Sequence, residues 1–175
     1  ALRTDISLSG SIILPGYTGT LAVTDGTATV PGLDEDLTAI EGTAEFDPAV
    51  VTIRDIRARY GSGSLSANGI VSGDLVSLNS ALESVPLDMS GIIADVSGLV
   101  QLQGDPKRER LTLTGNLTLE HGLVNPRQML LTGSDQLPVL EHLQLDLSLL
   151  TRRIEVADPA MSLFLSPSTL QLTGP

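Results

Sequence analysis

Apolar and polar residues alternate over most of the chain, and the clearest example is the stretch 111–122, LTLTGNLTLEHG. Side chains of a β-strand point alternately to opposite faces of the sheet. Leu111, Leu113, Leu117 and Leu119 therefore share one face, and threonine, asparagine and glutamate side chains share the other. This stretch predicts a strand with one apolar and one polar face.

The same alternation predicts strands along the rest of the chain, separated by short loops rich in glycine, proline and aspartate. Between Ile53 and Ile56 the period slips by one residue, as a β-bulge produces. The segment 123–138 shows no regular pattern. The predicted strands lie around residues 6–8, 20–24, 37–46, 51–60, 65–71, 96–102, 111–119, 143–149, 154–156, 163–165 and 170–172.

Some segments fit two structures. Asp25-Gly26 is typical of a two-residue hairpin turn, and a bulge within a continuing strand explains it equally. Residues 75–86 match both helical and strand spacing, and we expect a strand followed by a short helical turn over 89–94. Arg152-Arg153 is expected to turn the chain between two strands.

The composition limits the functions that fit this pattern. Aromatic residues make up 2% of the chain and tryptophan is absent, so Leu, Ile, Val and Ala build the apolar face. The net charge of −11 disfavours nucleic acids and broad adhesion to anionic membranes. No cysteine is available for a disulfide or a thiolate metal site, and no apolar run approaches the length of a membrane span. The start at Ala1 suggests a segment of a longer protein.

The two halves of the chain resemble each other. Residues 19–26 (GTLAVTDG) align with 115–122 (GNLTLEHG), 6–10 with 100–104, and 51–55 with 154–158. A module of roughly 100 residues repeated end to end is typical of an elongated architecture that grows by adding units. We therefore expect one elongated β-domain made of two repeat-like halves, about 1–95 and 96–175.

Catalytic motifs are absent from the sequence. His121 and His142 have no nucleophile in a recognisable context, and His121 aligns with the turn residue Asp25. The acidic run 34–36 lacks the ligand spacing of a calcium loop and is expected to be a solvated turn. We predict no enzymatic activity, no cofactor and no metal site.

The spacing of these strands resembles the repeat unit of the TamB family. The resemblance is carried by residues 97–106 (SGLVQLQGDP) and 111–122, and in the first half by residues 19–26, 30–33, 40–42, 46–47 and 53–61. It implies a segment of a large envelope protein, anchored in the inner membrane and crossing the periplasm, related to AsmA-like and bridge-like lipid-transfer proteins. It also implies a sheet folded lengthwise into a trough, a β-taco, whose apolar face holds acyl chains or guides outer-membrane protein segments.

The physical argument points the same way. A sheet with one apolar face must cover that face with a second layer, and the sequence contains no long amphipathic helices that could do so. The sheet either closes on itself as a sandwich or barrel, or curls around a groove filled by lipid; we favour the groove. Its predicted floor consists of Leu21, Val23, Phe46, Ile53, Tyr60, Leu65, Leu102, Leu111, Leu113, Leu117, Leu119, Leu143, Leu145, Leu147, Ile154 and Val156.

The sequence therefore predicts an all-β, non-enzymatic conduit for phospholipid acyl chains between the inner and outer membranes. The alternative is a module for outer-membrane protein assembly or secretion, which pairs client β-strands along open sheet edges. The resemblance adds a possible outer-membrane barrel partner of the BamA/TamA type. Two open edges also predict edge-to-edge self-association.

Overall fold

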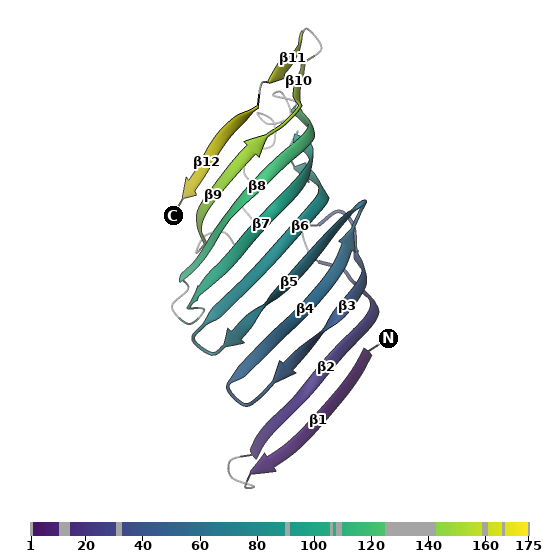
Figure 1. The fold of residues 1–175 in the computed structure, drawn as a ribbon, viewed down its shortest axis with the longest axis vertical. Coiled ribbons are helices and arrows are strands. Elements are labelled where there is room, and N and C mark those ends of the chain that lie inside the picture. Colours follow the sequence, from purple (N-terminus) through teal and green to yellow (C-terminus); the bar gives the residue numbers. More distant parts are fainter. Residues whose placement is uncertain are drawn as a thin grey trace.

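A computed structural model describes residues 2–10, 15–30, 33–89, 92–105, 107, 110–124, 143–158, 161–165 and 167–174. These residues form one 12-stranded sheet without any α-helix (Figure 1). The all-β prediction is confirmed. The strands are β1 (Leu2–Gly10), β2 (Pro15–Ala28), β3 (Leu37–Phe46), β4 (Val50–Tyr60), β5 (Gly63–Ser72), β6 (Val76–Met89), β7 (Ile92–Asp105), β8 (Arg110–Val124), β9 (Leu143–Thr151), β10 (Ile154–Asp158), β11 (Met161–Leu165) and β12 (Ser168–Gly174).

The first eight strands lie side by side in chain order, and each is antiparallel to the next. The order changes after β8, because β9 and β10 both pair parallel to it. Leu143 pairs with Leu111 and Glu155 with Leu123, so β9 and β10 follow β8 in one constant register. In the same way β12 pairs with β9 and β11 with β10, and these two strands form the far edge.

All twelve strands belong to one sheet (Figure 1). Within the described residues, every pair of strands in extensive contact is a hydrogen-bonded neighbouring pair. No large described side chain is fully enclosed. The side chains that reach the buried class are few, and the apolar ones are Ala58, Tyr60, Ala94, Val96, Leu147 and Ile154. The described strands form an open sheet that does not close into a barrel.

Bulges interrupt the strands at most of the residues with left-handed backbone angles, whereas Arg153 lies between β9 and β10. The non-glycine residues with positive φ are Asp25, Ala39, Asp55, Ser84, His121 and Arg153, and all six are exposed. Bulges bend a strand and increase its twist, and Asp and His tolerate this region better than most residues do.

The bulge predicted between Ile53 and Ile56 is confirmed by a register shift at that point. At Asp25-Gly26 the strand also continues, with a register shift between Val23 and Gly26, so the bulge is right and the hairpin turn is wrong.

Two further predictions are corrected and one is confirmed. The strand over 75–86 is confirmed as part of β6; the bulge at Ser84 brings Val85 onto the face of Leu82, which imitates helical spacing. The predicted helical turn over 89–94 is wrong, because Met89 ends β6 and Ile92 pairs with it at the start of β7. Arg152-Arg153 does not reverse the chain, because β9 and β10 run in the same direction along β8.

The two aligned halves share local geometry at their best-matched stretches. Ile6 pairs with Gly19 in the first half, and the aligned Val100 pairs with Gly115 in the second. The aligned residues Asp25 and His121 have φ angles of 52° and 51°. The match of 51–55 with 154–158 has no such counterpart, because β4 pairs antiparallel with its neighbours and β10 pairs parallel with β8.

Candidate functional site

The predicted floor residues lie on one face of the sheet, which we call the apolar face. Strand periodicity and the pairing register place them together across β2 to β10. Leu102, Leu113 and Leu145 are direct cross-strand neighbours on β7, β8 and β9. In the first half, Leu21 pairs with Ala44, which pairs with Ile53.

Direct pairing joins most of the predicted residues into rows that cross the strands. Leu117 pairs with Leu149, which pairs with Leu170 at the edge, and Leu111 pairs with Leu143. Phe46 pairs with Val51, and Leu65 pairs with Leu82. Leu119 pairs with Val96, whereas Tyr60 lies at the turn end of β4 opposite Gly63. The alternation of side chains along each strand places the other four floor residues on this face as well. They are Val23, Leu147, Ile154 and Val156.

Burial on the apolar face falls toward the edge of the sheet. Leu147 is 8% exposed and Ile154 4%, whereas Leu170 and Leu172 on the edge strand β12 are 53% and 45% exposed. Within the described chain, the strand pairs in close backbone contact are hydrogen-bonded neighbours. The face is apolar and continuous across these strands.

The sequence-based list missed some members of this face. Ala94 is 3% exposed and lies next to Gly122, as Ile154 does, although the sequence pattern predicts a helical turn there. Three further members fit the strand pattern, but only the pairing register shows that they share rows with predicted floor residues. The pairs are Val96 with Leu119, Leu78 with Leu102, and Leu82 with Leu65.

Glycines on this face keep the strands close together. Gly98 lies between Leu82 and Leu117 with φ of 144°, and a Cβ there would meet the backbone oxygen of Asn116 and lie 2.9 Å from the Cα of Leu117. Glycine kinks and bulges are the features that curve a sheet.

The opposite face carries the charged groups and the larger hollows. Its ion pairs among the described residues include Arg54–Glu45 at 2.8 Å, Arg57–Asp55 at 2.9 Å and Arg152–Glu120 at 3.2 Å, all with exposed side chains. The Nδ1 of His121 lies 3.5 Å from the carboxylate of Asp95, also on the surface. Exposed pairs of this kind contribute about 0–1 kcal/mol each. Two hollows of about 580 and 590 Å³ lie on this polar face, whereas a hollow of about 40 Å³ lies between Leu21, Val23, Ile40 and Ile56 on the apolar face.

The candidate catalytic and metal residues form no site in the described chain. His121 contacts Asp95 on the surface and belongs to a bulge, and His142 lies outside the described residues. The acidic residues 34–36 occupy an exposed loop, where the backbone N–H of Asp34 donates to the Tyr60 hydroxyl at 3.3 Å. Among the residues with described positions, no three histidine or carboxylate side chains gather as a metal site, and no helix has the length and apolarity to cross a membrane.

Comparisons with known proteins add no relative. No family model matches the chain, and no curated protein or solved structure is significantly similar to it.

Proposed function

We propose that this chain is a non-enzymatic lipid-binding segment, and that phospholipid acyl chains cover its apolar face. The observation that carries the proposal is that apolar side chains form continuous rows across the neighbouring strands of one sheet. An apolar sheet face needs a covering layer, and acyl chains supply one. Each methylene buried against the face contributes about 0.8 kcal/mol.

The setting proposed for this activity is the bacterial cell envelope. The resemblance of residues 97–106 and 111–122 to the TamB repeat supports a place in a periplasmic, inner-membrane-anchored protein that carries phospholipids toward the outer membrane. The bulges and glycine kinks support a sheet curved lengthwise into a trough, with the apolar face inside. The partners proposed with this setting are acyl chains and an outer-membrane barrel protein of the BamA/TamA type.

Binding without a head-group site fits the residues on this face. The floor is built mainly of aliphatic side chains, with Phe46 and Tyr60, and its predicted members include no charged residue. Affinity then grows with the length of acyl chain covered, because the apolar contact is non-directional and proportional to area. Lipids of different head groups are expected to bind with similar affinity.

A direct test is native mass spectrometry of the purified chain, combined with extraction and analysis of co-purifying lipid. The proposal expects bound phospholipid and exchange of a fluorescent phospholipid between donor and acceptor vesicles. Purified chain that carries no lipid, and takes up none from vesicles, would refute it.

The second candidate function is pairing of client β-strands, and the free edges of the sheet favour it. β1 pairs on one side with β2, and β12 pairs on one side with β9, so each leaves one row of backbone groups available within the described chain. Client-strand binding that is retained in a lipid-free preparation would support this alternative. The open edges can also pair with each other, which would give oligomers that form as the protein concentration rises. Loss of these oligomers in the variant Ile6→Pro would show that they form edge to edge.

A further inference from the structure

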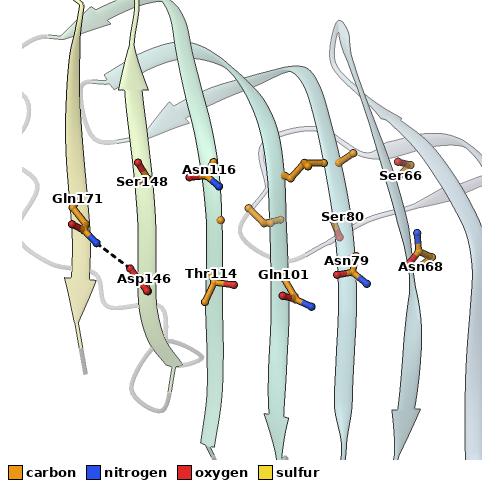
Figure 2. A pocket seen from close by; sticks show the side chains of 14 residues that line it. Ser66, Asn68, Asn79, Ser80, Gln101, Thr114, Asn116, Asp146, Ser148 and Gln171 are labelled. Carbon is orange, nitrogen blue, oxygen red and sulfur yellow. Dashed lines mark hydrogen bonds between the residues drawn. The ribbon is translucent and has the colours of Figure 1, made fainter.

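A ladder of polar side chains, of which only Asp146 is charged, crosses the polar face in one of its large hollows. Asn68, Asn79, Gln101, Thr114 and Asp146 pair directly, each with the next, on β5, β6, β7, β8 and β9. Figure 2 shows these side chains side by side in a hollow of about 580 Å³. Neighbouring strands are about 4.8 Å apart, so the ladder extends for about 19 Å across the sheet.

The hollow is nearly free of charge, although the chain as a whole is strongly acidic. Asp146 is the only charged residue among those lining it, and the Nε2 of Gln171 donates a hydrogen bond to its carboxylate at 3.4 Å. The second hollow of the same face differs, because Glu41, Asp55, Arg57, Arg59 and Glu83 line it. Low charge is therefore a local property of the first hollow, not of the whole polar face.

The lining offers both hydrogen-bond donors and acceptors, and one apolar surface. Each Asn and Gln amide can donate and accept, as can each hydroxyl. The hydrogen bond between Gln171 and Asp146 is the one drawn between lining side chains in Figure 2. Leu99 lies among these groups with 66% of its surface exposed, and its direct neighbours are Ala81 and Asn116.

These properties select one class of ligand. A polyanion would find no cation in the hollow, and a polycation would find one carboxylate. An apolar ligand would cover amides and hydroxyls without satisfying them, which costs free energy. A sugar chain satisfies them, because its hydroxyls donate and accept while its C–H groups contact an apolar side chain such as Leu99.

We propose that this hollow binds a neutral linear oligosaccharide, which lies across the strands along the ladder from Asn68 to Asp146. The site is on the face opposite to the apolar face, so it is independent of acyl-chain binding. A protein that fails to bind lipid and still binds the sugar would refute only the function proposed above.

Isothermal titration calorimetry with maltohexaose, cellohexaose and chitohexaose tests the proposal on the full chain. At least one of the three is expected to bind with a millimolar or tighter Kd. The variant Asn79→Ala/Gln101→Ala is expected to weaken that binding at least tenfold, and Leu99→Ala severalfold. All three substituted residues lie on the solvent side of a sheet, so circular dichroism is expected to show the wild-type strand content.

The matched control is Glu41→Gln/Glu83→Gln, which alters the charged hollow of the same face and is expected to leave sugar binding unchanged. Failure of all three sugars to bind at millimolar concentration would overturn the proposal. It would also be overturned by equal losses in the two double variants, or by tighter binding of the polyanion heparin than of any neutral sugar.

Discussion

Replacement of Leu113 by aspartate tests whether acyl chains cover the apolar face. Leu113 lies at the centre of a row, with Leu102 and Leu145 as its direct neighbours on β7 and β9. Burial of an unpaired charge is strongly unfavourable, so an acyl chain cannot cover a carboxylate at this position. The acyl chain is then expected to lose its contacts with the side chains at 102, 113 and 145.

The structure gives the size of this effect. The three leucines are half-buried in the sheet. Full burial of a leucine contributes about 1.5–3 kcal/mol, and at most about a third of each side chain is still exposed, so covering it contributes up to about 1 kcal/mol each. Loss of the three contacts weakens lipid binding by up to about 3 kcal/mol, or up to roughly 150-fold.

The same variant is expected to remain folded, because the rest of the described chain buries Leu113 only in part. Its cost in unfolding free energy is about 1–2 kcal/mol, from lost strand propensity and lost cross-strand contacts. The matched control is Thr112→Asp, which places the same group one residue away on the polar face, between Gln103 and Gln144.

Vesicle-based lipid transfer and urea unfolding measure the two quantities. Transfer by Leu113→Asp that equals that of Thr112→Asp would refute acyl-chain binding at this face. Complete unfolding of Leu113→Asp alone would show that protein, not lipid, covers the leucines.

Three further predictions concern stability and are measured by urea unfolding. Gly98→Ala is expected to lower the free energy of unfolding by at least about 1–2 kcal/mol, because φ is positive at this residue and an added Cβ would meet the backbone of β8. The control Gly174→Ala should change it little, because the space around Gly174 is open. Equal effects of the two variants would contradict this geometry. Leu147→Ala should cost about 2–3 kcal/mol and Leu172→Ala less than half as much, given their 8% and 45% exposure; the reverse order would mean that the edge strand is covered. Tyr60→Phe should cost under about 1 kcal/mol through the lost hydrogen bond from Asp34, and a larger loss would indicate further partners of the hydroxyl.

The alternation along the chain was sufficient to predict most strands and the side of each one that is apolar. Period-2 patterning fixes which side chains share a face, and the residues from Leu111 to Leu119 illustrate this. The bulge after Ile53 was also predictable, since a one-residue slip in the pattern has few other causes.

Bulges without such a slip were not predictable from local sequence. Asp25-Gly26 fits a hairpin turn and a bulge equally, and the structure decides because β2 has strands on both sides that its backbone must satisfy. The same holds for Ser84, where the bulge places Val85 on the face of Leu82 at a spacing of three residues, as in a helix. Arg152-Arg153 interrupts the alternation as a turn does, but the chain keeps its direction and its register along β8 on both sides of this pair.

The sequence by itself determined that this protein is a β-sheet with one mainly aliphatic face, because apolar and polar residues alternate along each strand and so lie on opposite sides of it. Only the tertiary structure decided which side chains meet across strands, because register depends on pairing between distant segments. The parallel pairing of β8 with β9 brings Leu113 to Leu145 on one face and Thr114 to Asp146 on the other. The apolar rows and the polar ladder therefore both depend on the register between strands, which the sequence of a single strand does not specify.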